Sequence, residues 1–307
     1  VVPPGTGVSI QSSLAALSVR ALQPDWHDPY MQHWSLDLQQ QFGEKTVVTA
    51  GYFGSKGTHL IGTYELNEVP AGTALNRLCA PLNSTSTTPS VPCQNPGAAF
   101  TATANSVILD QIRPYRGYRS IAMITPQFNS NYHSLQVSAV RRFTGASQVS
   151  AGYTWSKNLT DNQTDRSTAP QNTFNIKQDY GRATLDRRQI FTANYIYELP
   201  WFANRHDFVG NVLGGWQASG VVTLNTGVPF TAATSSFDPA GLGFVPALVA
   251  GGRPNTLCDP NAGAPHDRLK YFNTQCFASN PTSNISNIIG TAGRGTIDGP
   301  PTKRFDF

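Results

Sequence analysis

The chain has 307 residues, of which 39% are hydrophobic and only 13% are charged, and its formal net charge is +4. A soluble globular protein averages roughly 25% charged residues, so this deficit is typical of a protein that keeps charge away from lipid. The scattered positive charge disfavours a nucleic-acid-binding protein, and no apolar run reaches the ~20 residues of a transmembrane helix. The 27 glycines and 22 prolines are turn formers, and they favour an all-β protein with long polar loops.

The first alternating segment follows an irregular, proline-interrupted stretch up to about residue 28, which we expect to be a loop. Residues 33–42 alternate apolar and polar side chains, the pattern of a β-strand with one apolar face. Residues 43–45 form a short turn, and residues 46–55 alternate again, so the two segments predict a β-hairpin. The largely apolar face carries Trp34, Leu36, Leu38, Gln40 and Phe42 in the first strand and Val48, Ala50 and Tyr52 in the second.

The same unit recurs twice, with a short turn at 144–147 in the second hairpin and a longer link at 200–215 in the third. Residues 304–307 resemble the start of one more strand. Residues 118–128 either extend the strand that follows them or form a short loop strand. We expect about seven or eight strands in all. The clearest of them are 33–42, 46–55, 131–143, 148–157, 188–199 and 216–227.

Long polar segments separate the hairpins, at roughly 56–119, 156–188 and 231–303. Such loops are uncommon in compact soluble domains, whereas outer-membrane barrels combine long extracellular loops with short periplasmic turns. The strands also have about the right length to span a membrane, and aromatic residues gather near their ends. We therefore predict an antiparallel meander of amphipathic hairpins that forms part of a transmembrane β-barrel, with apolar faces toward lipid and polar faces toward the lumen. A soluble antiparallel sheet with one buried face gives the same alternation and is the alternative.

The four cysteines fall into two local pairs that bracket polar, proline-containing stretches. Cys79 and Cys93 form one pair, and Cys258 and Cys276 form the other. Neither pair has the short spacing of zinc ligands. Two disulfides that staple loops in an oxidising compartment are therefore favoured over a metal site, with four free thiols as the alternative.

No known catalytic motif, such as a Gly-x-Ser-x-Gly elbow, is present, and we expect no enzymatic activity, no metal and no cofactor. Asp161, Gln163 and Asp165 alternate as calcium-loop oxygens do, but the glycine and the distant glutamate are missing, so we expect a solvated loop. At residues 186–188 (Asp-Arg-Arg) we expect a structural ion pair rather than substrate recognition. We assign surface or lumen positions to the six histidines, which are His27, His33, His59, His133, His206 and His266.

A series of short strings carries more specific information when it is read in order. The strings are Gly51-Tyr52-Phe53-Gly54-Ser55-Lys56-Gly57-Thr58-His59-Leu60, Arg113-Pro114-Tyr115-Arg116-Gly117-Tyr118, Tyr132-His133-Ser134-Leu135-Gln136-Val137, Tyr153-Thr154-Trp155-Ser156-Lys157, Asp186-Arg187-Arg188-Gln189, Tyr197-Glu198-Leu199-Pro200, Gly214-Gly215-Trp216-Gln217, Gly293-Arg294-Gly295 and Phe305-Asp306-Phe307. Together they resemble the C-terminal half of the barrel of TonB-dependent receptors of the Oar-like type. The resemblance covers nearly the whole chain beyond about residue 30.

The resemblance implies an architecture for the parent protein. Members of that family carry a signal peptide, a TonB-contacting segment, a plug domain and a barrel of about 22 strands. The sequence starts without Met or a signal peptide and contains none of these N-terminal parts, so we expect residues 1–307 to be a partial barrel from a longer protein. Because unpaired strand edges are not tolerated in lipid, we do not expect this piece to form a pore by itself.

The resemblance also implies a function, which is TonB-dependent uptake of an unidentified ligand by the parent protein in the outer membrane of a Gram-negative bacterium. The implied partners are outer-membrane lipid, the TonB energy-transducing complex, reached through the missing N-terminal parts, and an extracellular ligand held by the long loops. No residue can be assigned to the ligand, and we expect no nucleic-acid partner. The alternatives are a surface adhesion or structural barrel without transport, and a secreted β-sandwich binding module.

Overall fold

The computed structural model describes residues 17–70, 113–143, 145–163, 170–201, 212, 214–233, 252–278 and 289–307. These residues are mostly β-structure, and none of their helices has the length and apolar character needed to cross a membrane. The helical segments are the 3-10 helices η1 (Thr173–Asp179) and η2 (Thr274–Cys276). The longer strands are β1 (Leu17–Leu22), β2 (Tyr30–Phe42), β3 (Thr46–Glu65), β4 (Tyr118–Arg142), β5 (Gln148–Thr160), β7 (Gln189–Glu198), β8 (Gln217–Asn225) and β13 (Thr302–Asp306). The two-residue strands are β6 (Gly181–Arg182), β9 (Pro229–Phe230), β10 (Asn255–Thr256), β11 (Phe277–Ala278) and β12 (Ile297–Asp298).

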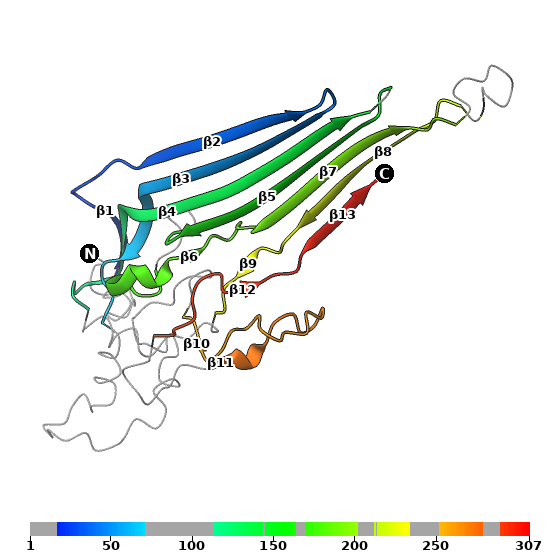
Figure 1. Ribbon diagram of the computed structural model, residues 1–307. Coiled ribbons are helices and arrows are strands. Elements are labelled where there is room, and N and C mark those ends of the chain that lie inside the picture. The colour runs from blue at the N-terminus through cyan, green and yellow to red at the C-terminus, as the bar shows by residue number, and fades with distance from the viewer. Residues whose placement is uncertain are drawn as a thin grey trace, which may run out of the picture.

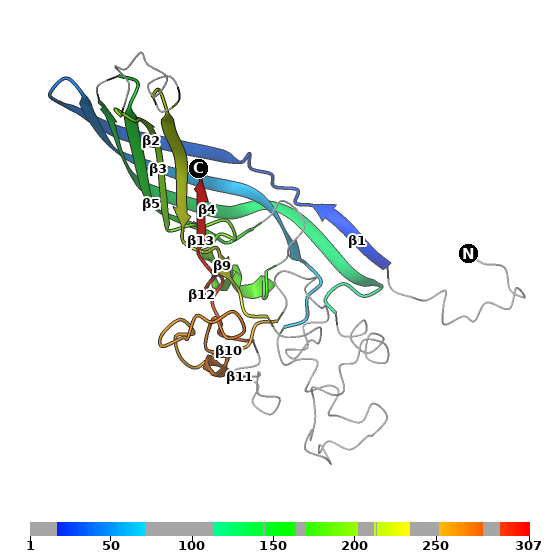
Figure 2. The ribbon, with the colours of Figure 1, turned by 90° about the vertical axis from the view of Figure 1, so that its right-hand side faces the viewer.

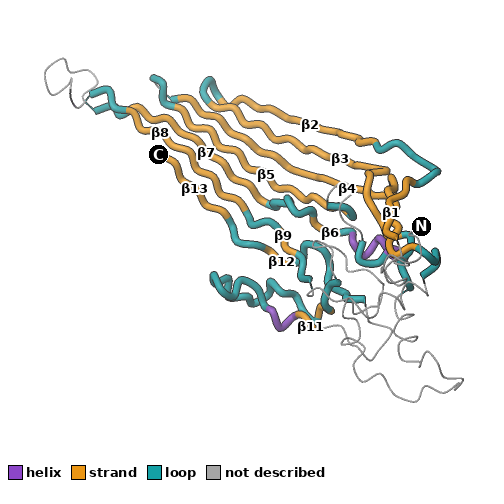
Figure 3. Tube along the Cα trace, turned by 180° about the vertical axis from the view of Figure 1, so that it is seen from behind, coloured by secondary structure: helices purple, strands orange, loops and turns teal. Residues whose placement is uncertain are grey.

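Most of the described strands form one nine-stranded sheet with the order β13-β8-β7-β5-β4-β3-β2, in which β1 also pairs with β4 and β6 with β5 (Figure 1). Neighbours along this path are antiparallel, and each pair is also consecutive among the longer strands of the sequence. Figure 3 shows the same strands side by side from behind. The structure therefore confirms the predicted meander of hairpins. Strands β2 and β13 are its two edges, and they do not pair with each other, so the described sheet does not close into a barrel.

Short turns lie at one end of this sheet, and two of them depend on a glycine. Gly43, between β2 and β3, has a φ of +62°, and Gly145, between β4 and β5, has a φ of +72°. Both are left-handed backbone conformations, which a residue with a Cβ adopts only at a cost in free energy. This end matches the short turns expected from the sequence, although most of the 200–215 link lies outside the described residues.

At the opposite end, strands β3 and β4 continue far beyond the predicted boundaries. The expectation of a single polar loop from 56 to 119 was wrong at both ends, because β3 runs to Glu65 and β4 begins at Tyr118. Residues 118–128 thus extend the strand that follows them. With 20 and 25 residues, β3 and β4 exceed the roughly 9–11 residues that cross a membrane, so both must project from it.

A bulge in β3 marks the beginning of this projecting part. The pairing of β3 with β4 shifts register between Gly57 and Leu60 and again before Gly62. Between them His59 has a φ of +58°, and its Nδ1 lies 3.1 Å from the carbonyl oxygen of Pro126. Bulges bend a strand and increase its twist, which explains why the pairing continues in a new direction beyond this point.

The first strand was not predicted. The segment before residue 28 was expected to be a loop, but β1 (Leu17–Leu22) pairs in parallel with β4, with Val19 opposite Ile121 and Leu22 opposite Ile124. A short strand whose partner is about a hundred residues away has no local sequence signal, because its stability comes from the pairing itself.

The buried apolar residues of the described chain gather at the end of the sheet that carries the long loops. In contrast, every residue of β2 is exposed. Figure 2 shows the long strands as one curved layer, with β9 to β12 beyond one end of it. The buried residues are Val69, Ile121, Met123, Phe128, Ala183, Cys276, Ala292 and Ile297.

Candidate functional site

Two features of the structure are candidates for function, and the first is the face of the sheet that we call the outer face. Residues directly opposite each other in an antiparallel pair point to the same side. Register therefore places Leu38, Ala50, Val137, Tyr153 and Phe191 on one face in a continuous row. The apolar residues of the outer face are Trp34, Leu36, Leu38, Phe42, Val48, Ala50, Tyr52, Leu135, Val137, Ala139, Val149, Ala151, Tyr153, Trp155, Phe191, Ala193, Tyr195, Tyr197, Ala218, Val222, Leu224 and Phe305. The same register places fewer polar residues on this face, including Gln40, Thr46, His133, Arg141, Lys157, Gln189 and Lys303.

Large apolar side chains on the outer face are exposed. Leu36 is 64% exposed, Leu38 is 68% exposed and Trp155 is 58% exposed. Monomeric soluble proteins rarely expose an apolar surface that extends over several strands. A soluble sheet or a β-sandwich would cover this face with a second layer, and the described residues provide none.

The dimensions of the outer face fit a bilayer. From Trp34 to Phe42 the apolar positions of β2 extend about 26 Å along the strand, at about 3.3 Å per residue. With a strand tilt of ~35–45°, the band is about 20 Å tall, close to the ~25 Å of outer-membrane barrels. Aromatic residues lie toward the loop end of the band, as expected for a membrane interface, and they include Trp34, Tyr52 and Trp155.

The opposite side, which we call the inner face, is mostly polar, although it also carries apolar residues such as Phe53, Val47 and Val140. Beside the apolar row it carries Ser35, Asp37, Gln39, Gln136 and Thr154. A polar inner face and an apolar outer face are the arrangement of strands that surround a lumen in lipid.

The second candidate is a group of buried ion pairs where the long loops meet, which we call the loop-end assembly. The carboxylate of Asp179 is fully buried, and it accepts hydrogen bonds from Arg253 Nη1 at 2.6 Å and from the backbone N–H of Gln171 at 2.8 Å. Arg294 Nη2 lies 3.1 Å from the same carboxylate. One aspartate thus joins the β5–β7 connection to two points of the β8–β13 connection.

A second ion pair reinforces this junction. Arg182 Nε donates to Asp186 Oδ2 at 2.7 Å, and Arg182 also pairs with Asp298. The other carboxylate oxygen of Asp186 accepts from the backbone N–H of Asn158 at 2.8 Å. Asp186 therefore forms the structural ion pair that the sequence favoured, although its partner is Arg182 and not one of the adjacent arginines.

The ends of β3 and β4 join the same assembly through side chains that bind backbone groups. Glu65 Oε1 accepts from the N–H groups of Ile121 at 2.7 Å and Asn67 at 3.0 Å. Glu68 Oε2 accepts from the N–H of Thr173 at 3.0 Å, in η1. The described ends of the β3–β4, β5–β7 and β8–β13 connections are thus held together by polar contacts rather than by a large apolar core.

Burial changes the titration of groups in this assembly. Desolvation lowers the pKa of Arg294, partly opposed by the nearby carboxylate of Asp179. Desolvation likewise raises the pKa of Asp161, whose carboxylate accepts from the backbone N–H of Asn129 at 2.7 Å. In this structure Asp161 therefore connects the end of β5 to the backbone of β4. Of its two companions in the weak calcium-loop pattern, Gln163 binds the Arg182 carbonyl, and Asp165 lies outside the described residues.

No cluster of three or more potential metal ligands occurs within the described ranges. The described histidines do not converge on a common point. His27 stacks on His59 with 5.2 Å between ring centroids, and His133 contacts Tyr52. His206 lies outside the described residues.

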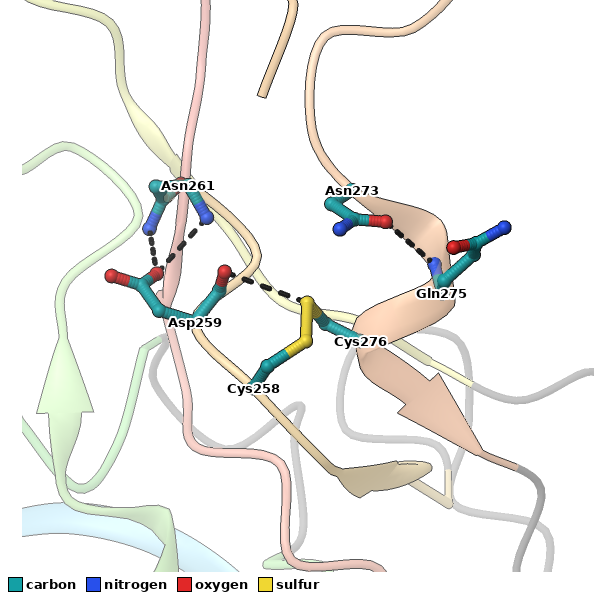
Figure 4. Close-up of a disulfide and its surroundings, with 6 residues drawn as sticks. All are labelled: Cys258, Asp259, Asn261, Asn273, Gln275 and Cys276. Carbon is teal, nitrogen blue, oxygen red and sulfur yellow. Dashed lines mark hydrogen bonds between the residues drawn. A yellow bond between two sulfur atoms is a disulfide. The ribbon is translucent and has the colours of Figure 1, made fainter. Parts of the chain in front are cut away.

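The structure joins Cys258 and Cys276 by a disulfide that closes an 18-residue separation, with 4.8 Å between the Cα atoms (Figure 4). Asn261, within the closed loop, donates from Nδ2 to the carbonyl oxygen of Thr296 at 2.8 Å. The stapled loop is thereby attached to the segment that leads into β13. The other predicted pair, Cys79 and Cys93, lies outside the described residues.

Sequence reasoning missed the central residues of the loop-end assembly, namely Asp179, Arg253 and Arg294. Asp179 and Arg253 are separated by 74 residues, and Arg294 is still further along the chain, so no local spacing connects the three. The one available signal is the scarcity of charge, since only 13% of residues are charged and each one in a loop is a candidate for pairing.

A one-layered antiparallel sheet with an exposed apolar face, a polar face and loops gathered at one end defines an outer-membrane β-barrel protein. Comparison with protein families agrees, because the model of the outer membrane beta barrel domain matches residues 2–307. The chain belongs to this family, and its location is the outer membrane. Searches of curated proteins and of solved structures returned no match.

The outer face makes a direct prediction for stability. Leu38→Arg should destabilise the parent protein in lipid vesicles by about 2–4 kcal/mol, because it places a cation near the bilayer midplane. The control is Gln39→Arg on the inner face, which should cost far less. Urea unfolding of the vesicle-inserted protein gives both values. Equal costs would contradict the assignment of faces, since an exposed leucine of a soluble sheet tolerates such a change within about 0.5 kcal/mol.

The loop-end assembly makes a second prediction. Asp179→Asn leaves two buried guanidinium groups without their carboxylate and should cost about 3–5 kcal/mol locally. Hydrogen exchange in residues 170–182 and 289–296 should accelerate accordingly. Asp306→Asn is the matched control, because its ion pair with Arg304 is exposed and contributes at most about 1 kcal/mol. Unchanged exchange in Asp179→Asn would show that the ion pairs do not hold the loops.

Proposed function

We propose that this chain is part of the barrel of an outer-membrane receptor that imports an extracellular ligand in a TonB-dependent manner. The observation that carries the proposal is the openness of the sheet. Strands β2, β3, β4, β5, β7, β8 and β13 lie side by side without β2 and β13 pairing. In a barrel of only eight strands, seven neighbouring strands would curve almost into a closed ring, with one strand missing between the two edges.

An open arc of this kind supports a large barrel completed by further strands of the parent protein. Barrels of about 22 strands have a lumen too wide for side chains to fill, and a plug occupies it. The ordered sequence strings that resemble TonB-dependent receptors agree with this size class. We propose a non-enzymatic role for the barrel, with the outer face in contact with membrane lipid and with TonB acting through parts of the parent protein outside this chain.

The loop-end assembly supports a receptor role. Its buried ion pairs hold the described parts of the β5–β7 and β8–β13 connections together, and hydrogen bonds of Glu65 and Glu68 add the β3–β4 end. Rigid loops at the mouth of a barrel present a defined surface to a ligand. The same feature is compatible with the second candidate, a surface adhesion barrel without transport, because an adhesive surface also needs ordered loops. The secreted β-sandwich is inconsistent with the one-layered sheet.

Uptake by living cells separates receptor from adhesin. Cells that produce the parent protein are grown in a complex medium, and mass spectrometry follows the loss of small molecules from it. We expect a set of compounds whose depletion requires both the parent protein and TonB, and Asp179→Asn should reduce it while the protein stays in the membrane. Asp306→Asn should not reduce it. Depletion profiles that are identical with and without the parent protein would favour the adhesion barrel.

A further inference from the structure

A hollow of about 450 Å³ lies on the outer face, near the end of the membrane band that is closest to the long loops. It is formed by β3, β4 and β5, together with the residue that precedes β7. The surface around the hollow is the apolar face of the sheet. The side chains that define it are Tyr52, His133, Leu135, Trp155, Lys157 and Arg188.

Aromatic rings form a fixed wall on one side of this hollow. Tyr52 Oη lies 2.7 Å from His133 Nδ1, and their rings stack with 6.2 Å between centroids. Trp34 extends the wall, with its ring 6.1 Å from that of His133. It reaches this place because it lies across Gly54, where a Cβ would come within 2.2 Å of the indole. Such rings suit the boundary between headgroups and acyl chains.

The other side of the hollow is cationic. Lys157 lies directly opposite His133 in the β4–β5 pair, so it belongs to the outer face, and Arg188 completes the lining. Neither side chain forms an ion pair with a carboxylate of the described residues. The register of the spanning strands places no Asp or Glu on the outer face: the described carboxylates of these segments, Asp37, Glu198 and Asp306, are on the inner face.

Two cations beside an apolar surface imply a ligand with an anionic head and an apolar tail. Leu135 lines the hollow, and from it the outer face continues toward the short-turn end. Long basic side chains at a membrane interface bury their stems in the apolar region and place their charge among the headgroups, where they attract anionic lipid. A soluble anion would use the cations but would leave the aromatic wall and Leu135 without a partner.

We propose that this hollow binds the phosphate-bearing headgroup of an anionic membrane lipid, with the phosphate between Lys157 and Arg188 and an acyl chain over Leu135. The site is independent of whether the protein imports a ligand. It gives one point of the barrel circumference a defined lipid neighbour, in addition to the general contact of the outer face with hydrocarbon.

Native mass spectrometry of the parent protein tests this proposal. The protein is transferred from phosphatidylcholine nanodiscs that contain phosphatidic acid, a phosphate monoester, and the retained lipids are counted. The variant Lys157→Gln/Arg188→Gln should lower the retention of phosphatidic acid by about tenfold or more, since each interfacial cation contributes about a fivefold attraction. The control is Arg141→Gln, which removes a cation from the outer face at the short-turn end and should change retention little.

A second measurement keeps both Lys157 and Arg188 and compares two lipids by fluorescence quenching. Brominated phosphatidic acid should quench the fluorescence of Trp155 more than brominated phosphatidylcholine does, with Trp155→Phe providing the difference signal. Equal losses in the double variant and in Arg141→Gln would overturn the site in favour of diffuse attraction. Equal quenching by the two lipids would also overturn it. Complete displacement of phosphatidic acid by inorganic phosphate would identify a free-anion site and contradict the lipid.

Discussion

Backbone hydrogen bonding inside lipid is the constraint on which this structure depends. Water is absent from the hydrocarbon region, so every N–H and C=O group there must find a partner on a neighbouring strand. Within the membrane band, the antiparallel ladders from β2 to β8 are continuous and meet this requirement without a second layer. With the backbone satisfied in this way, side chains alternate freely, and apolar residues face outward while polar residues face the lumen. The same constraint requires further strands at the edges β2 and β13.

Outside the membrane band a different interaction takes over. The described loops have few buried apolar residues, and their order depends on carboxylates that bind arginines and backbone N–H groups. Asp179 accepts from Arg253 and from Gln171, and Glu65 accepts from Ile121. Buried pairs of this kind contribute little net stability, but breaking one is costly, so they favour a single arrangement of the loops. The disulfide between Cys258 and Cys276 adds a covalent cross-link to the same region.

Sequence periodicity predicted the membrane band well because side-chain alternation and strand pairing are local there. The hairpin of residues 33–42 and 46–55 appears with its faces as expected. Prediction failed where stability comes from distant partners. Strand β1, the extension of β3 to Glu65 and the pairing of Asp179 with Arg253 all depend on segments far away in the chain. Asp186 was correctly expected to form an ion pair, but the partner, Arg182, emerged only from the fold.

Lipid accessibility along β2 tests the central claim most directly. Each residue from 33 to 42 is replaced in turn by cysteine carrying an environment-sensitive fluorophore, and a lipid-soluble and a water-soluble quencher are compared. The account predicts a period of two, with the lipid-soluble quencher dominant at Trp34, Leu36 and Leu38 and the water-soluble quencher dominant at Ser35, Asp37 and Gln39. Water access at both sets of positions, or lipid access at the polar set, would contradict it.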